Sequence, residues 1–124
     1  MAEAAGVTVL LVEDDDDNRE LMAEVLEFAG HRVVAAASGA EALRVLASRP
    51  VDVVVTDVGM PDVGGLEVAR AAKKAVPAVP VLVVTGYAER ADIRSAHGHE
   101  IDRVLVKPVD PDVLTATIAE MVNR

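Results

Sequence analysis

The chain has 124 residues, of which 52% are hydrophobic, and its 12 basic and 21 acidic residues give a net charge of −9. It contains no cysteine, which excludes disulfides, thiolate metal sites and cysteine nucleophiles, and its negative charge argues against direct nucleic-acid binding, which needs a basic surface. Because it lacks a signal-peptide pattern and the ~18 apolar residues of a membrane span, we expect a single cytoplasmic domain that does not bind membranes.

Strand-like and helix-like segments alternate five times along the chain. The strand segments are short apolar runs rich in β-branched residues, which is typical of strands buried on both faces. In the helical segments the apolar residues recur at helical spacing, and Ser38 with Glu41 matches a capping box. In chain order we expect a strand over 7–12, a helix with an apolar face from Leu21 to Ala29, a weaker strand over 33–36, a helix from Ser38 through Leu46, a strand over 51–56, a helix from Leu66 to Lys73, a strand over 81–84, a poorer helix over 88–97, a short strand over 104–106 and a helix that starts at Asp110 and Pro111.

This alternation predicts an α/β fold with a parallel sheet and helices on both faces, because parallel strands need crossover connections. Residues 1–6 are expected to form a flexible N-terminal tail, and residues 7–124 the folded domain. Arg124 comes directly after the last helical pattern, so we expect no second domain.

Polar side chains follow four of the predicted strands. Glu13 and Asp14 follow the first, Asp57 the third, Thr85 ends the fourth and Lys107 follows the fifth. Taken singly, the acids are typical of solvated turn residues, Thr85 of an ordinary strand residue and Lys107 of a lysine whose amine reaches the solvent. Ligands of open α/β sheets bind outside the carboxyl ends of the strands, however, so these side chains are expected to converge on one crevice.

The residue types in that crevice favour phosphoryl chemistry. Packed carboxylates repel one another, and they either raise a pKa or recruit a cation. An oxygen-rich, sulfur-free site suits Mg²⁺. Lys107 and Thr85 would supply a positive charge and a donor to a phosphoryl group, while Asp57, the central acid, can act as the nucleophile that forms an aspartyl phosphate.

Four motifs, VLLVEDD, VVVTDVGMPDVGGLEV, VLVVTGYAE and VLVKPVD, closely resemble in order and spacing the receiver domain of two-component response regulators. The resemblance covers the chain from about Val7 to Val122. It implies a flavodoxin-like, doubly wound sheet of five parallel strands in the order 2-1-3-4-5, with five helices.

The resemblance also implies the reaction and its metal. Asp57 is implied to accept a phosphoryl group from a phosphohistidine on a histidine kinase or histidine phosphotransfer protein. Mg²⁺ is implied to be held directly by Asp14 and through water by Glu13. Asp57 and the backbone carbonyl of Gly59 would complete the protein's share of the coordination.

The same resemblance gives roles to the other strand ends. Thr85 corresponds to the switch hydroxyl that moves to the phosphoryl oxygen, and Lys107 to the lysine that pairs with the phosphate, with a bond to Pro108 that is often cis. Tyr87 lies at a position that tunes the lifetime of the acyl phosphate. Leu105 stands where many members carry Tyr or Phe, so aromatic switching in its usual form is not expected.

The sequence therefore predicts a phosphoacceptor switch for a downstream protein, which assists its own phosphorylation and dephosphorylation but is not otherwise an enzyme. Partner specificity is expected mainly on the helix from Asn18 to Ala29, and a homodimer through the fourth helix, fifth strand and fifth helix is left open. The alternatives are a pseudo-receiver that only binds proteins and a receiver excised from a hybrid kinase. A haloacid dehalogenase-type phosphatase would need an acid at Gly59, and a flavodoxin-like carrier would not place EDDDDN beside a phosphate.

Overall fold

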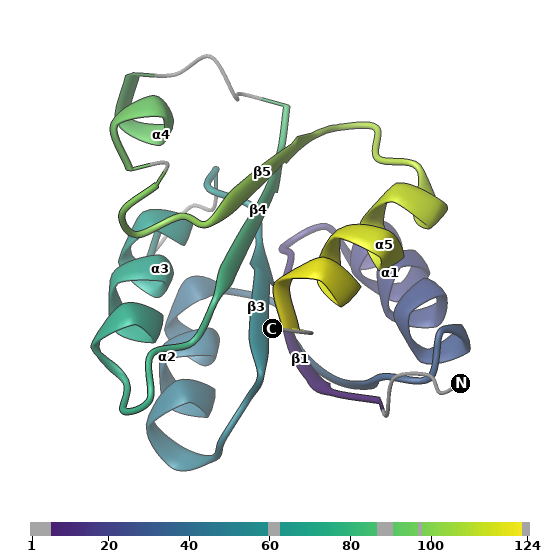
Figure 1. The fold of residues 1–124 in the computed structure, drawn as a ribbon, viewed down its shortest axis with the longest axis horizontal. Helices are drawn as coiled ribbons and strands as arrows, with labels where there is room; N and C mark the ends of the chain where they lie inside the picture. The colour runs from purple at the N-terminus through teal and green to yellow at the C-terminus, as the bar shows by residue number, and fades with distance from the viewer. Residues whose placement is uncertain (1–5, 60–62, 87–90, 97, 123–124) are drawn as a thin grey trace.

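The computed structural model describes residues 6–59, 63–86, 91–96 and 98–122. Within these residues, five parallel strands form one sheet in the order β2-β1-β3-β4-β5, with helices on both of its faces (Figure 1), which confirms the expected fold. In chain order the elements are β1 (Thr8–Val12), α1 (Asp16–Phe28), β2 (Arg32–Ala36), α2 (Gly39–Ser48), β3 (Val53–Thr56), α3 (Gly65–Lys74), β4 (Val81–Thr85), α4 (Ala91–Ala96), β5 (Arg103–Val106) and α5 (Pro111–Val122).

The inner strands are buried along their whole length. Every residue of β1, β3 and β4 is buried, which explains why these strands are continuous apolar runs in the sequence. The edge strands β2 and β5 are only partly covered, and their apolar runs are correspondingly shorter. Predicted and observed strand bounds differ by no more than two residues.

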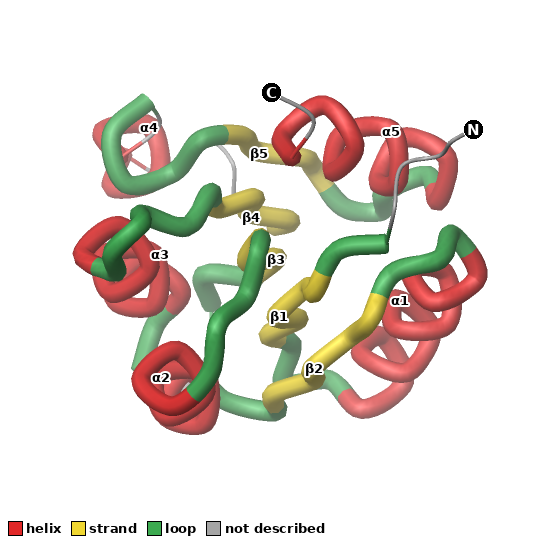
Figure 2. The backbone as a smooth tube through the Cα atoms, turned by 60° about the horizontal axis from the view of Figure 1, so that its bottom comes forward, coloured by secondary structure: helices red, strands yellow, loops and turns green. Residues whose placement is uncertain are grey.

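Helices α1 and α5 cover one face of the sheet, and α2, α3 and α4 cover the other (Figure 2). Successive side chains of a strand point to opposite faces, so Leu10 packs in the cluster beneath α2, α3 and α4, whereas Leu11 packs with α1 and α5. Ile93, the only large apolar residue of α4, is 1% exposed and anchors that short helix. The two clusters hold the sheet rigidly between its layers.

The helix starts follow local capping chemistry. Ser38 and Glu41 form a variant of the predicted capping box: the Glu41 amide donates to the Ser38 hydroxyl at 3.1 Å, and the Glu41 carboxylate accepts at 2.8 Å from the amide of Ala37, the residue before the N-cap. Asp15 caps α1 by accepting from the Asn18 amide at 2.9 Å. This places the acidic run at the positive end of the α1 dipole.

Two sequence predictions fall partly outside the described residues. Residues 1–5 of the predicted tail lie outside the described residues, so the division into tail and domain stays a prediction. Residues 88–90 and 97 of the predicted fourth helix also lie outside them, and the structure describes this helix as Ala91–Ala96. None of the described helices combines the length and the apolar character needed to cross a membrane.

Candidate functional site

Three charged side chains meet at the carboxyl edge of the sheet. The Lys107 ammonium donates to Glu13 Oε1 at 3.0 Å and to Asp57 Oδ2 at 2.8 Å. The side chains of Lys107, Glu13 and Asp57 are 27%, 4% and 14% exposed, so this is a largely buried group of charges. The convergence expected from the strand ends is therefore present for these three residues.

The hydrogen-bond ladder of the sheet places these backbones. Each strand pairs for one residue beyond its last regular position: the Glu13 amide donates to the Ala36 carbonyl at 3.1 Å, the Asp57 amide to Val12 at 3.3 Å and the Lys107 amide to Thr85 at 3.0 Å. Because their backbone amides are hydrogen-bonded to the sheet, these three residues are held in place by the strands that precede them. The peptide bond between Lys107 and Pro108 is cis, as the family resemblance implied.

Both oxygens of the Asp57 carboxylate accept hydrogen bonds. Oδ1 accepts from the backbone amides of Val58 at 2.6 Å and Gly59 at 3.2 Å, and Oδ2 accepts from Lys107. Burial alone would raise the pKa of Asp57, but the Lys107 ammonium and the two amides outweigh it and hold this pKa below its ordinary value of 3.8. Burial would likewise lower the pKa of Lys107, yet the carboxylates of Asp57 and Glu13 raise it above 10.5. The site therefore holds an ionised acid beside a protonated amine at neutral pH.

Glu13 is fixed more firmly than its place in an acidic run indicates. Its second carboxylate oxygen accepts from the Asp15 amide at 3.1 Å, and its backbone carbonyl accepts from the Arg19 guanidinium at 3.0 Å. Arg19 also pairs with Asp16 at 2.6 Å and so ties the first turn of α1 to the loop that carries Glu13. Sequence reasoning missed Arg19, although a single arginine three residues after Asp16 in an acidic helix start is a recognisable signal for such a pair.

The structure differs from the sequence-based picture of three packed carboxylates. Asp14 is exposed, and among the described residues no group of three acidic or histidine side chains is arranged as a metal site. The physical reason is that Lys107 lies between Glu13 and Asp57 and neutralises their repulsion, which leaves Asp14 on the solvent side. Thr85 lies fully buried at the end of β4, next to the strand that carries Lys107. Tyr87 lies outside the described residues.

The chemistry of the donors fits Mg²⁺ even though they are not gathered around one point. The exposed carboxylate of Asp14, the carboxylate of Asp57 and the backbone carbonyl of Gly59 are hard oxygen donors on the loops that follow the neighbouring strands β1 and β3, and Glu13 is joined to Asp57 through Lys107. The chain has no sulfur ligand from cysteine that would favour a softer metal.

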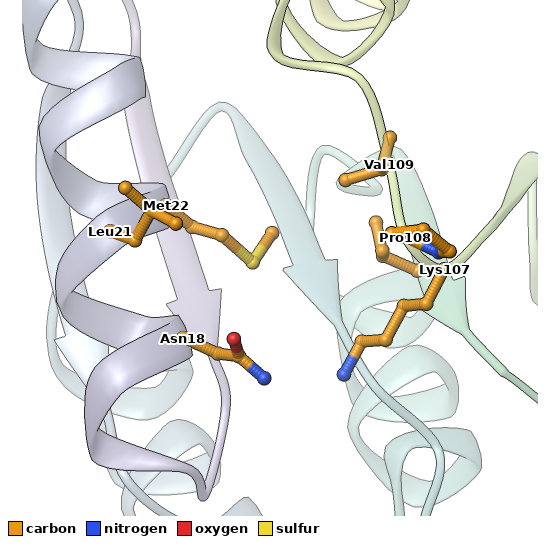
Figure 3. Close-up of a pocket in the computed structure, with 7 residues that line it drawn as sticks. Asn18, Leu21, Met22, Lys107, Pro108 and Val109 are labelled. Carbon is orange, nitrogen blue, oxygen red and sulfur yellow. The ribbon is translucent and has the colours of Figure 1, made fainter.

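A shallow groove of about 380 Å³ opens beside the charged group, between α1 and the loop that follows β5. Figure 3 shows Met22 and Val109 pointing into it from opposite walls, with the Asn18 amide and the Lys107 amine at the same end. An apolar groove therefore leads directly to the amine that pairs with Asp57.

Comparison with known sequences identifies the same family throughout the chain. The family model of the response regulator receiver domain matches residues 9–119. The chain is 35% identical over 100 residues to the response regulator receiver protein CpdR of Brucella abortus, which covers 81% of this chain and 83% of CpdR. Longer curated relatives also match, and the chain spans only 26% of the length of two transcriptional regulatory proteins to which it is 34% identical.

Solved structures match equally well. A receiver domain protein from Methanospirillum hungatei superposes with a TM-score of 0.89 at 28% identity, over 96% of this chain and 95% of that one. The response regulator TrrA from Thermotoga maritima, solved in complex with Mg(2+)-BeF, superposes with a TM-score of 0.83 at 30% identity, over 93% of this chain and 98% of TrrA. In TrrA, magnesium thus accompanies a fold of this type.

Proposed function

Since this chain belongs to the response regulator receiver domain family of two-component systems, we propose that Asp57 is its phosphoacceptor. The observation that carries the assignment is the pairing of Asp57 Oδ2 with the Lys107 ammonium at 2.8 Å, at the edge of the sheet where the buried Glu13 also lies. The remaining steps follow from this geometry and the charges around it.

The proposed reaction is transfer from a phosphohistidine on a histidine kinase or a histidine phosphotransfer protein. A carboxylate oxygen of Asp57 forms a bond to phosphorus while the bond from phosphorus to the donor's imidazole nitrogen breaks. The electron pair of that bond stays on the nitrogen, so histidine is regenerated and Asp57 becomes an acyl phosphate. Water later attacks the phosphorus, restores the carboxylate and releases inorganic phosphate.

The surroundings of Asp57 favour one oxygen as the nucleophile. Oδ1 already accepts from the Val58 and Gly59 amides, which orient the carboxylate. Oδ2 accepts only from Lys107 among the described residues, so it keeps a lone pair for the attack. The Lys107 ammonium also offsets the charge of the incoming phosphoryl oxygens, which is the main requirement of phosphoryl transfer.

We propose that Asp14, Asp57 and the Gly59 carbonyl hold Mg²⁺, with Glu13 beside them. When bound, this ion supplies charge neutralisation for the transferred phosphoryl group. Glu13 keeps its contact with Lys107 and so fixes the amine close to the acceptor oxygen.

The proposed output is a conformational change of the α4, β5 and α5 face, read by a downstream protein. Thr85 and Lys107 lie on neighbouring strands joined by the Lys107 amide and the Thr85 carbonyl. A phosphoryl group that draws the Thr85 hydroxyl toward it would therefore act on β4 and β5 together. Leu105, in place of an aromatic residue, is partly buried in the cluster beneath α1 and α5, which supports an output without a rotating ring.

The phosphodonor protein is proposed to dock on α1 and the groove beside Lys107. Leu21 is 61% exposed and Phe28 is 96% exposed on this helix, which is an unusual display of large apolar side chains on one helix. The exposed acids of α1, among them Glu20 and Glu24, flank these side chains, so the partner surface is expected to be apolar at its centre and basic at its rim.

Intact mass spectrometry after incubation with Mg²⁺ and acetyl phosphate tests the proposal directly. We expect one phosphoryl adduct on the wild type, no adduct on Asp57→Asn, and no adduct on the wild type when a chelator is present throughout the incubation. Asp52→Asn is the matched control, because Asp52 precedes the opposite end of the same strand and bonds the Thr8 amide instead. This control should be phosphorylated like the wild type.

Acetyl phosphate is a small donor, so a second donor separates the site from its access. If neither acetyl phosphate nor a histidine phosphotransfer protein modifies the folded wild type, the phosphoacceptor assignment is wrong and the chain is a protein-binding module. If an adduct forms but persists in Asp57→Asn, another residue is the acceptor.

A further inference from the structure

Thr56, the last residue of β3, carries a buried hydroxyl that the proposed reaction does not use. The three residues before it are valines, and Thr56 is only 1% exposed. A buried hydroxyl is unfavourable unless it is hydrogen-bonded. Here it donates to the backbone carbonyl of Asp57 at 2.8 Å, so its partner is the phosphoacceptor residue itself.

The same carbonyl is enclosed from a second side by the start of α3. A Cβ atom added at Gly65 would lie 2.1 Å from the Asp57 carbonyl oxygen and 2.9 Å from the Val58 Cα, which is closer than atoms can approach. Only a glycine therefore allows α3 to lie against this peptide. The Asp57 carbonyl is held between the Thr56 hydroxyl and the Gly65 backbone.

The peptide plane transmits this restraint to the carboxylate. The Asp57 carbonyl and the Val58 amide belong to one planar peptide group, so fixing the direction of the carbonyl also fixes the direction of the N–H. That N–H donates to Asp57 Oδ1 at 2.6 Å, the shortest of the three hydrogen bonds to the carboxylate. Oδ1 and Oδ2 are parts of one rigid group, so the orientation of Oδ2 toward Lys107 depends on the same peptide.

We propose that Thr56 is a positioning residue for phosphorylation, which acts through the peptide between Asp57 and Val58 to orient the acceptor carboxylate. This inference rests on the proposed function of Asp57. The hydroxyl touches neither the phosphoryl group nor its donor. Its contribution is to hold the carboxylate in the orientation from which Oδ2 attacks.

Thr56→Val is the test, because valine keeps the branched shape and removes only the hydroxyl. We expect the rate of phosphorylation by acetyl phosphate to fall about fivefold to tenfold, in line with the loss of one neutral hydrogen bond. We expect the midpoint of urea unfolding to fall, and by about as much as in a variant that loses a comparable buried hydroxyl elsewhere, since a buried carbonyl loses one donor. Thr56→Ser keeps the hydroxyl and should restore most of the rate. Thr56→Ala replaces the valine variant if that one does not fold.

Thr117→Val is the matched control. Thr117 is 7% exposed and its hydroxyl donates to the Val113 carbonyl at 2.7 Å, within α5 and away from Asp57. This variant loses the same kind of bond and should be phosphorylated at the wild-type rate. Equal rates for Thr56→Val and the wild type, equal slowing by Thr117→Val, or a serine variant as slow as the valine variant would each overturn the proposal.

A spectroscopic measurement keeps this test separate from the assignment of the acceptor. The Val58 amide proton, in a short bond to a carboxylate, should resonate downfield in the unphosphorylated wild type and move upfield in Thr56→Val but not in Thr117→Val. Unchanged Val58 and Gly59 amide signals in Thr56→Val would refute the positioning role even in a chain that takes up phosphate. Failure of the wild type to take up phosphate would instead refute the role of Asp57.

Discussion

Replacing Lys107 by methionine should strongly destabilise the domain even in its unphosphorylated state. The ammonium is bound at 3.0 and 2.8 Å by Glu13 and Asp57, whose side chains are only 4% and 14% exposed. Removing one partner of a buried ion pair costs about 3–5 kcal/mol. The Lys107 side chain is 27% exposed, so water replaces part of its contacts, and we expect a loss of about 2–3 kcal/mol at pH 7.

Urea unfolding followed by circular dichroism measures this loss. Lys73→Met is the matched control, because Lys73 pairs with the single carboxylate of Asp102 at 2.5 Å and that side chain is 35% exposed. Lys73 is 25% exposed, about as much as Lys107, but the carboxylate that its removal leaves behind is far more exposed than Glu13 and Asp57, so we expect this pair to be worth about 1 kcal/mol. If Lys107→Met lost no more stability than Lys73→Met, the lysine would not be neutralising two buried carboxylates, and the interpretation of the site would be wrong.

The same site predicts a change of sign in a double variant. In the wild type, Asp57→Asn removes a paired charge and should lower the free energy of unfolding by about 1 kcal/mol. In the Lys107→Met variant, Asp57 is a buried carboxylate without its ammonium partner, so adding Asp57→Asn should raise the free energy of unfolding. Without Lys107, burial is the largest influence on the pKa of Asp57 and raises it, so the stability deficit of Lys107→Met relative to the wild type should shrink as the pH falls from 7 to 5. A deficit that grows on acidification would contradict this reasoning.

Three further predictions concern the scaffold. Burial lowers the pKa of His31 below 6.5, and its Nδ1 accepts from the Val7 amide, so the free energy of unfolding should fall as the pH drops through 6.5. Urea unfolding of His31→Asn, which keeps an acceptor but does not titrate, should not show this fall. Ser38→Ala removes the cap of α2 and should lower the free energy of unfolding by about 1 kcal/mol, whereas Ser38→Asp should retain it. Gly65→Ala should lower the free energy of unfolding by about 1–3 kcal/mol and slow phosphorylation, because the added Cβ would overlap the Asp57 carbonyl. An unchanged thermal unfolding midpoint would contradict that contact.

The parts of the fold that could be predicted are those whose signal comes from burial on both faces. Apart from one threonine in each, β1, β3 and β4 consist of apolar residues because both faces of the sheet are covered, and none of the helices in the described part of the chain is apolar in this way. β2 is an edge strand with mixed exposure, so its apolar signal is weaker. The start of α1 was not located from its apolar face, because its first turn is made of acids that stabilise the helix end rather than pack.

The meeting of Glu13, Asp57 and Lys107 at one edge of the sheet could be expected from the sequence, but the pairing of their charges could not. Parallel strands bring the ends that carry Glu13, Asp57 and Lys107 to one edge of the sheet, which follows from the alternation of strands and helices, whereas the strand order was implied by the family resemblance. The length and burial of the side chains decide which charges pair, and the spacing of residues along the sequence does not give this information. The sequence therefore led us to expect Asp14 among packed carboxylates, whereas the lysine satisfies its two more buried neighbours and Asp14 faces solvent.

β3 is a buried strand that is followed directly by the charged residue Asp57. Asp57 needs a rigid support, which the valines of β3 provide, and a fixed orientation, which backbone amides and Lys107 provide. The proposed phosphorylation of Asp57 would replace the carboxylate by a group with one more negative charge, and Lys107 would have to hold this larger charge with the same three donor hydrogens. The phosphoryl oxygens would then compete with Glu13 for the Lys107 ammonium. Glu13 is therefore the neighbour that we expect to be most affected by an acyl phosphate, and its loop leads directly into α1, where the phosphodonor is proposed to dock.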